Sequence, residues 1–239
     1  MANSEFKFNY LDLETQLDLA KAKGYEFLSC AEYVHRKGTL SDKTIVLRVD
    51  IDFSVKKAGR VHSILLKLGI PATYFLRLHA SEYNPFSFEN YRILKAIVSD
   101  GYELGYHSEV VDQQAIWQED PEKCLRRDLK ILSEMFGVEV RGVASHGGLT
   151  GLNNLDFWGT RDPQQFNLLY EAYDKTDSFG LFDNSFYISD SEWYRWKCYS
   201  NGKLVEGDHR CFAAHLSEDH SLIYLLIHPD TYFDNHIYE

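Results

Sequence analysis

Two aspartates at the end of an apolar segment constrain this chain more than any other feature. The segment runs from Thr44 to Val49 and leads into Asp50-Ile51-Asp52. Its residues favour a β-strand, and on an extended strand the carboxylates of Asp50 and Asp52 point the same way. Like charges this close stay together in a folded protein only where a cation, a proton or a hydrogen-bond network compensates them. The pair therefore predicts a cation site, although a strand-end turn and a helix N-cap would also use aspartate here.

The composition is that of a globular protein and argues against several other classes. Of the 239 residues, 44% are hydrophobic and 26% are charged, which fits neither a disordered nor a fibrous chain. The formal charge of −11 argues against a nucleic acid or an anionic membrane as partner, because both bind clustered Lys and Arg. The sequence has no basic-then-apolar leader and no long apolar run, so we expect neither a secretion signal nor membrane insertion.

The four cysteines indicate the compartment. They are Cys30, Cys124, Cys198 and Cys211, and their wide spacing matches neither a zinc-binding pair nor a dense disulfide framework. Free thiols are typical of a reducing compartment. We therefore expect a cytoplasmic protein.

Strand and helix patterns alternate along the chain. Apolar strand patterns cover 44–49, 71–76, 102–106, 138–144 and 222–227, and the helical spacings between the first four end at Gly69, Gly101 and Gly137. This alternation predicts βαβ units, parallel pairing and an α/β fold class. The rhythm is less regular between 147 and 222, but no linker or repeat divides the chain. We expect one domain over residues 1–239, with 1–43 as a helical lead-in.

Ionisable side chains follow the predicted strands. The acid pair follows the first strand, Arg77 and His79 the second, His107 and Glu109 the third, His146 the fourth and His228 the last. Parallel strands bring their carboxyl ends to one edge, where such folds have their active sites. Carboxylates and imidazoles gathered there match a catalytic zinc-like site with one coordination position open for water.

Each of these residues also has a structural alternative. A single histidine at a strand end more often only hydrogen-bonds a neighbouring carbonyl, whereas four of them favour a shared site. Glu109 is equally an acid of a first helical turn, and Arg77 equally a structural ion pair. The 15% aromatic residues suit an amphipathic cleft as well as a core, and Trp193, Tyr194 and Trp196 are open to both interpretations.

Several short segments carry a resemblance to a known family. They are Arg48-Val49-Asp50-Ile51-Asp52-Phe53, Ala72-Thr73-Tyr74-Phe75, Gly101-Tyr102-Glu103-Leu104-Gly105-Tyr106-His107-Ser108 and Ile227-His228-Pro229. In sequence and order they resemble the polysaccharide deacetylase family, also called the NodB-homology domain or carbohydrate esterase family four. The similarity is to a divergent branch of surface-polysaccharide biosynthesis proteins, in which a Ser-His pair and an Asp-Ser stretch recur. Here these look like Ser145-His146 and the segments around Asp183 and Asp190.

The resemblance implies a fold and an activity. The fold is a distorted (β/α) barrel of about seven parallel strands over 44–232, and the activity is metal-dependent hydrolysis of an N- or O-linked acetyl group on a sugar. Carried over by position, Asp50 is the general base, His228 the general acid, and Asp52 and His107 are metal ligands. Zinc is the expected metal, with cobalt and nickel as alternatives. The substrate is an acetylated sugar of glycan assembly, nucleotide-linked or lipid-linked.

Four further residues are expected to bind that substrate. They are Arg77, His79, Asp183 and Asp190.

The chain departs from the family pattern at two places. The second motif normally has another histidine four residues after the first, but this position is Val111. His146 is the preferred third ligand, with Glu109 and Asp112 as alternatives. The third motif normally supplies an arginine followed by a proline, where this chain has Ser145-His146. Two other functions therefore stay open: an inactive homologue that binds a carbohydrate or a partner, and a deformylase or other amide hydrolase.

Overall fold

A single mixed sheet runs through the molecule. The computed structural model describes residues 8–235 of the chain. Its strands are β1 Glu26–Leu28, β2 Thr44–Ile51, β3 Thr73–Leu76, β4 Glu103–Ser108, β5 Gly142–Ser145, β6 Tyr170–Glu171, β7 Phe186–Ser189, β8 Lys197–Ser200, β9 Lys203–Leu204 and β10 Leu222–Ile227. The pairing order is β6-β5-β4-β3-β2-β10-β7-β8-β9, with β1 also paired to β2. Pairing is parallel from β6 to β7 and antiparallel from β7 to β9.

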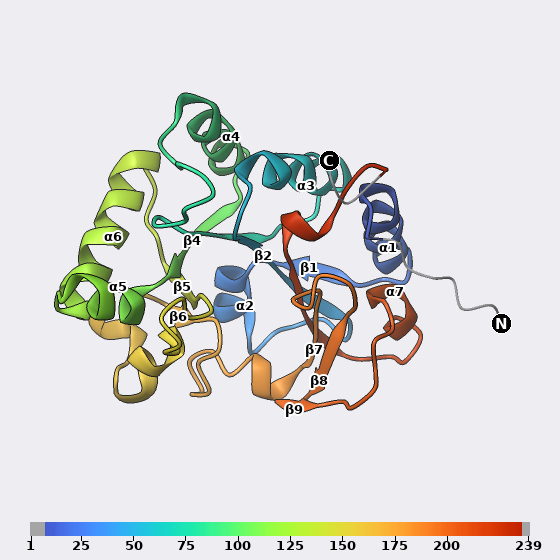
Figure 1. The fold of residues 1–239 in the computed structure, drawn as a ribbon. Helices are drawn as coiled ribbons and strands as arrows, with labels where there is room; N and C mark the ends of the chain where they lie inside the picture. Colours follow the sequence, from blue (N-terminus) through green and yellow to red (C-terminus); the bar gives the residue numbers. More distant parts are fainter. Residues whose placement is uncertain (1–7, 236–239) are drawn as a thin grey trace.

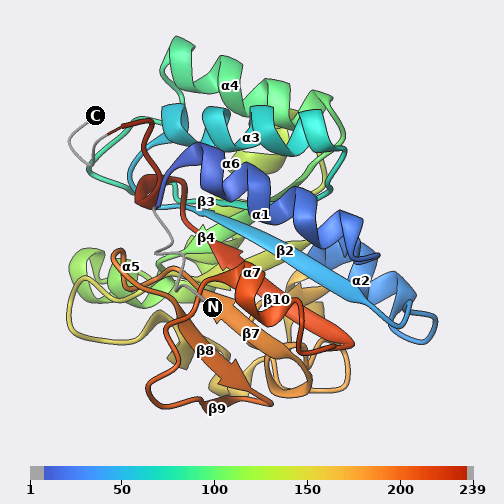
Figure 2. The ribbon, with the colours of Figure 1, turned by 90° about the vertical axis from the view of Figure 1, so that its right-hand side faces the viewer.

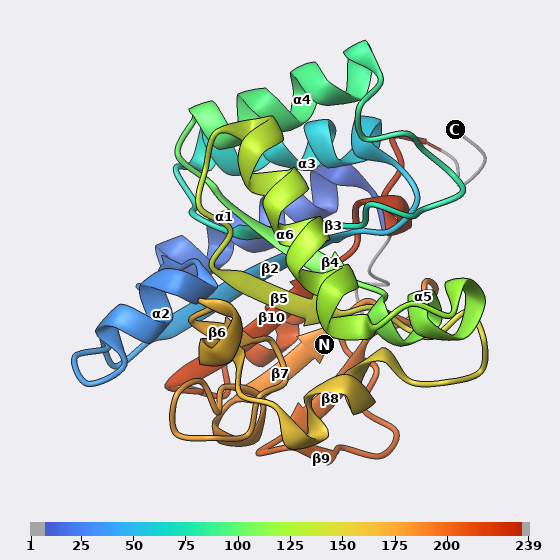
Figure 3. The same cartoon turned by 90° about the vertical axis from the view of Figure 1, so that its left-hand side faces the viewer.

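Helices lie on both faces of this sheet. They are α1 Tyr10–Ala22, α2 Cys30–Arg36, α3 Val55–Leu68, α4 Phe88–Ser99, α5 Val110–Trp117, α6 Pro121–Phe136 and α7 Phe212–His215, with short 3-10 helices η1 Asn154–Thr160, η2 Pro163–Phe166, η3 Phe182–Asn184 and η4 Pro229–Thr231. Figure 2 shows α1, α3, α4 and α6 gathered on one side. On the other side of the sheet, α2 packs against β2 (Figure 1). Figure 3 shows the part of the molecule that carries β5, β6, α5 and α6.

The α/β class with a parallel-rich sheet is confirmed, but the strand count is higher than predicted. The described residues form ten strands instead of about seven, because the hairpin β8–β9 and the short β1 and β6 join the sheet. Within residues 8–235 the order runs from β6 to β9 without a pairing that joins these two ends, so a closed barrel is not shown. The lead-in is also more than helical, since β1 extends the sheet beside the start of β2.

The alternation of side chains along β2 gives the sheet two different faces. Ile45, Leu47 and Val49 belong to the core under the outer helices, whereas Val46 belongs to a second core that includes residues of α2. Because side chains alternate along a strand, Arg48 and Asp50 follow Val46 on this second face. A buried ion pair therefore continues the second core toward the carboxyl end of β2.

The boundaries of α3 show why the chain turns where it does. The Ser54 hydroxyl accepts a hydrogen bond from the backbone N–H of Lys57, and Gly69 ends the helix in the left-handed conformation. Asp52 is therefore not the N-cap of this helix, and its carboxylate is left for another use. None of the helices in the described part of the chain combines the length and the apolarity needed to cross a membrane.

Gly105 on β4 makes room for an aromatic ring that supports the second face. It pairs with Phe75 on β3, and a Cβ at this position would lie 2.4 Å from Phe75 Cε1. The same ring carries the Arg48 guanidinium on its face, at 5.2 Å from the ring centroid. The second glycine of the Gly-Tyr-Glu-Leu-Gly motif thus has a packing role.

We expect Gly105→Ala to lower the free energy of unfolding by about 1–3 kcal/mol, because the added methyl group overpacks a buried aromatic site. Urea unfolding monitored by circular dichroism measures this change. Gly38→Ala is the matched control, since a Cβ there meets nothing within 4 Å. Equal stabilities of Gly105→Ala and Gly38→Ala would contradict this packing role.

Candidate active site

Asp50 is held by an arginine from its own strand. Arg48 Nε donates to Asp50 Oδ1 at 2.7 Å and Nη2 donates to Oδ2 at 2.6 Å, and both side chains are almost completely buried. The guanidinium lies between the rings of Phe75 and Tyr173, at 5.2 Å and 4.8 Å from their centroids. Burial by itself disfavours a charge on Asp50, but Arg48 and His107 overcome this and lower its pKa. Asp50 is therefore an ionised carboxylate in a fixed orientation.

Asp52 and His107 face each other beside this pair. His107 Nε2 lies 3.3 Å from Asp52 Oδ1 and 3.2 Å from Asp50 Oδ2. The other ring nitrogen, Nδ1, donates to the Ala144 carbonyl at 2.8 Å, which directs Nε2 toward the carboxylates. Burial opposes a charge on His107, but the two carboxylates raise its pKa. The predicted compensation of the acid pair is thus present here as a ring nitrogen that faces both carboxylates, in a position that a cation can take instead.

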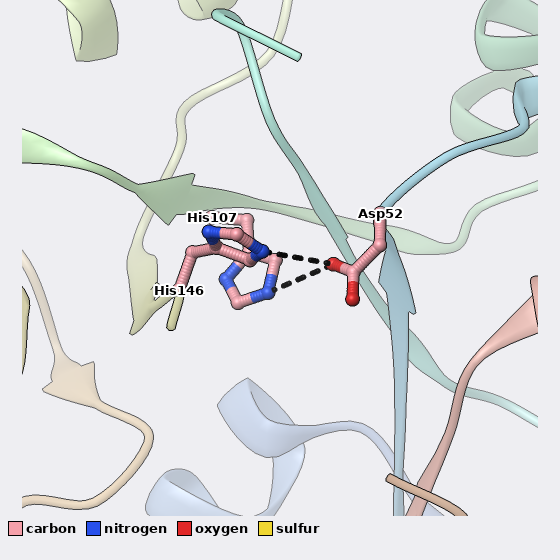
Figure 4. Close-up of side chains that lie close together, drawn as sticks. All are labelled: Asp52, His107 and His146. Carbon is pink, nitrogen blue, oxygen red and sulfur yellow. Dashed lines mark ion pairs between the residues drawn. The ribbon is translucent and has the colours of Figure 1, made fainter. Parts of the chain in front are cut away.

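His146 completes this group from the neighbouring strand end. It follows β5, and its Nε2 lies 3.9 Å from Asp52 Oδ1 (Figure 4). Its Nδ1 faces Glu109 Oε1 at 3.5 Å. Burial, followed by the nearby His107, lowers the pKa of His146 to about 4, so its ring is neutral at pH 7. A neutral imidazole with one nitrogen directed at a carboxylate oxygen is a suitable metal ligand.

The arrangement fits a divalent cation. One ligand atom each from Asp52, His107 and His146 lies within 4.8 Å of the others. Asp52 Oδ1 is buried and has no hydrogen-bond partner, which is an unfavourable state for an ionised oxygen unless another group binds it. Two imidazole nitrogens and one carboxylate oxygen form a ligand set typical of catalytic zinc.

Glu109 and Arg77 support this group from behind. Arg77 Nη2 donates to Glu109 Oε1 at 2.7 Å, and its Nη1 donates to the Asp52 carbonyl at 3.0 Å. Glu109 is the N-cap residue of α5, but its side chain makes no capping hydrogen bond, so its carboxylate is available to accept from Arg77 and to face His146. A carboxylate behind a histidine ligand fixes the ring and raises its basicity. Glu109 is therefore placed to orient His146 rather than to replace it.

His228 lies on the opposite side of Asp52 and has its own carboxylate. Asp190 Oδ1 accepts from His228 Nδ1 at 2.6 Å, and the backbone N–H of His228 also donates to Asp190. Its Nε2 points toward Asp52 Oδ2 at 3.8 Å. Burial alone would lower the pKa of His228, but Asp190 and the acid pair raise it to about 9. His228 is therefore protonated at neutral pH and presents an N–H to the site.

Aromatic side chains border this side of the group. Trp193 lies 5.4 Å from the His228 ring and 5.4 Å from the Phe53 ring, and both aromatic residues keep about two-fifths of their surface exposed. The φ angle of Trp193 is +64°, a conformation that non-glycine residues rarely adopt. Tyr194 is 71% exposed, whereas Trp196 is buried in the core. The aromatic segment thus divides between the site and the core.

The four predicted substrate-binding residues do not share one surface. Asp190 is completely buried against His228, and Arg77 is buried against Glu109, so both hold other side chains. His79 bonds Asp128 on α6 at 2.9 Å. Asp183 lies in η3, which precedes β7, so it is at the amino end of the strand whose carboxyl end leads to Asp190. The sequence motifs indicated these positions, but tertiary packing decides which groups each side chain contacts.

Asp112, the remaining alternative for the third ligand, and Val111, at the family's usual ligand position, both have structural roles. The Asp112 carboxylate accepts from the backbone N–H groups of Leu149 and Thr150 and from the Asn154 side chain, so it fixes the loop after His146. Val111 packs against the hydrophobic core. Of the residues considered for the third position, His146 is the one that faces Asp52 Oδ1.

One important residue received no role from the sequence. Arg48 is part of the motif 48–53, and the signal for its role is the period of two along a strand, which places it on the same side as Asp50. Arg141, the arginine nearest the third motif, is instead on the surface and bonds Glu139. Tyr173, which covers Arg48, carries no such signal, because its position depends on the irregular segment after β6.

Comparison with known proteins gives structural similarities only. No protein-family model matches this sequence, and no curated protein does. The structure is similar to solved structures of deacetylases. They include the Streptococcus pyogenes deacetylase PplD in complex with acetate (18% identity, TM-score 0.47, covering 64% of this chain and 67% of that one) and the deacetylase domain of BpsB from Bordetella bronchiseptica (13%, 0.46, 72% and 79%). A third is IcaB from Ammonifex degensii (19%, 0.48, 72% and 78%). Similarity at this level does not by itself carry over a function.

We expect His146→Ala to weaken zinc binding by more than about 100-fold, because loss of a ligand exceeds the 10–100-fold effect of losing a supporting carboxylate. Glu109→Gln should lie within that smaller range. Competition with a chromophoric chelator, with metal analysis of the dialysed protein, measures both. His79→Ala is the matched control, because His79 follows a strand but bonds Asp128. Unchanged zinc affinity in His146→Ala would remove it from the ligand set.

Proposed function

We propose that this chain is a metal-dependent hydrolase that removes an N- or O-linked acetyl group from a sugar. The observation that carries the proposal is the buried Asp52 Oδ1, which faces the Nε2 atoms of His107 at 3.3 Å and His146 at 3.9 Å, with the fixed carboxylate of Asp50 beside it. The deacetylase-like motifs at 48–53 and 101–108 supply Asp50, Asp52 and His107, and the Ser-His pair at 145–146 supplies His146, in the family's order. Asp52, His107 and His146 would hold the cation, zinc in the first place and cobalt or nickel as alternatives.

The bound cation supplies polarisation of the acetyl carbonyl and a lowered pKa of the attacking water. Asp50 is the group that accepts the proton of this water. Its ion pair with Arg48 keeps it ionised and fixes its direction, but also makes it a weak base. A weak base in a fixed position suits a water whose acidity has been raised, because proton transfer depends on the difference between the two pKa values.

His228 is the group that returns a proton to the leaving atom. Its Nε2–H faces Oδ2 of the Asp52 carboxylate, whereas His107 and His146 face Oδ1. Asp190 holds the ring through Nδ1, so that Nε2 is the nitrogen that gives up its proton. The leaving nitrogen of an amide requires such an acid, because it must be protonated before the C–N bond can break.

The exposed rings of Phe53 and Trp193 suit a sugar as the substrate. Trp193 presents apolar surface directly beside His228, and Phe53 extends this surface next to Trp193. Partly exposed aromatic rings with polar groups next to them favour ligands that have an apolar face and a hydroxylated edge. We propose an acetylated sugar, carried on a nucleotide or a lipid, and a cytoplasmic location that agrees with four free cysteines.

The test is release of acetate from N-acetylglucosamine oligomers and from an O-acetylated sugar by the zinc-loaded protein. We expect Asp50→Asn to reduce the rate by at least about 100-fold, with metal content retained, because the base is lost and the ligands are not. Quantifying acetate and formate separates a deacetylase from a deformylase. A metal-loaded protein that binds the oligomers and releases neither acid would be an inactive homologue.

The pH dependence provides a second test. The Asp190 carboxylate favours the charged form of His228, so its removal lowers the pKa of His228. We expect the alkaline limb of the kcat/KM profile to move to lower pH in Asp190→Asn by about one unit or more, since the acid loses its proton earlier. A merely structural role for Asp190 would lower the activity equally at every pH. Asp183→Asn is the matched control and should leave the profile in place.

A further inference from the structure

A second group of potential ligands lies on the other face of the sheet. Cys198 belongs to β8, Asp208 to the loop after β9, and His215 to α7. Cys198 pairs with Ile188 of β7 and belongs to the core under the outer helices, whereas Arg48 and Asp50 lie on the second face. The group is therefore separate from the candidate active site.

The three side chains are spaced like the ligands of one tetrahedral ion. Cys198 Sγ lies 3.5 Å from His215 Nε2, and Asp208 Oδ1 lies 3.6 Å from the same nitrogen. All three atoms lie within 4.8 Å of one another. Zinc–sulfur bonds of about 2.3 Å and zinc–nitrogen or zinc–oxygen bonds of about 2.0–2.2 Å, set at tetrahedral angles, separate neighbouring ligand atoms by roughly 3.3–3.6 Å. Two of the separations here are in or very near that range.

We propose that Cys198, Asp208 and His215 bind a second divalent cation of the zinc class, with a structural role. Thiolate and imidazole ligands select zinc and cobalt over magnesium and calcium. The ion would join β8, the loop after β9 and α7, three segments of the least regular part of the chain.

The surroundings support each proposed ligand. His215 Nδ1 lies 3.2 Å from Glu218 Oε2, which directs Nε2 toward the sulfur and the Asp208 oxygen. Arg210 donates to Asp208 through Nε at 2.9 Å and Nη2 at 2.6 Å, and also pairs with Glu218. Asp208 Oδ1 also accepts from the backbone N–H of Arg210 at 3.2 Å, so an ion bound at this oxygen would take the place of that longer hydrogen bond. Asp208 and Glu218 are thus both held in place by one guanidinium.

The charges balance when the ion binds. Arg210, Asp208 and Glu218 together carry a formal charge of −1 at neutral pH, with Cys198 as a thiol. Binding replaces the thiol proton, which leaves to solvent, by an M²⁺–thiolate bond, while His215 keeps its Nδ1–H toward Glu218. The thiolate adds −1 and the ion adds +2, so the group becomes neutral.

Burial favours this role over a nucleophilic one. The arrangement of a thiol, an imidazole and a carboxylate in space also matches a catalytic cysteine site. However, Cys198 and His215 have no exposed surface that a substrate could reach. A closed position is typical of structural metal sites. The Asp208 side chain is 10% exposed, so a water at this edge can provide the fourth ligand.

Cobalt substitution distinguishes this site from the active site, because the active-site ligand set contains no sulfur. The full-length protein is stripped of metal with a chelator, reloaded with Co²⁺, and examined by absorption spectroscopy and metal analysis. We expect two cobalt ions per chain and a thiolate-to-cobalt charge-transfer band in the near ultraviolet. Cys198→Ser should lose the band and one ion, whereas His146→Ala should keep the band.

Cys211→Ser is the matched control, since Cys211 is close in sequence to His215 but is not among the three proposed ligands, and it should keep both the band and two ions. Absence of the band from the wild-type protein would overturn the proposal without any variant, and so would its persistence in Cys198→Ser. Should Cys198→Ser fail to fold, His215→Gln provides the same comparison. Acetate release does not enter this test, so its outcome is independent of the proposed activity.

Discussion

The ion pair between Arg48 and Asp50 is the interaction on which the candidate site depends. Two opposite charges are fully buried two residues apart on the central strand β2, and they form two short hydrogen bonds. Removal of one partner from such a pair typically costs about 3–5 kcal/mol, because the other charge remains buried. The rings of Phe75 and Tyr173 enclose the guanidinium, and Gly105 makes the space for one of them. The fold thus fixes the direction of Asp50 before any ligand binds.

Three histidines surround this fixed carboxylate, and each has a further polar group on the side of the ring that faces away from the site. His107 has the Ala144 carbonyl, His146 faces Glu109, and His228 has Asp190. For His107 and His228 the hydrogen bond behind the ring decides which nitrogen meets the site, and for His146 the Nδ1 atom lies 3.5 Å from Glu109 Oε1. The rings come from the ends of three different strands, and parallel pairing is what brings these ends together.

The sequence predicted the parts of this arrangement that follow from strand ends. The apolar strands with ionisable residues behind them located Asp52, His107, His146 and His228, because parallel strands have a common carboxyl edge. It did not predict which residues lie behind them. Asp190 and Arg77 were expected to meet a substrate, but they are buried partners of His228 and Glu109, and no local pattern indicates a contact between residues 32 or 38 positions apart. The addition of the hairpin β8–β9 to the sheet likewise depends on tertiary packing.

The origin of the guanidinium has a consequence for how such a chain can change. The resemblance leads one to expect an arginine after the fourth strand and a second histidine at position 111, and this chain has neither. Here the guanidinium that holds Asp50 is Arg48 of the same strand, and the position after β5 is taken by the imidazole of His146. Because Arg48 and Asp50 both belong to β2, the loop after β5 has no part in holding Asp50. This loop can therefore change without breaking the buried ion pair.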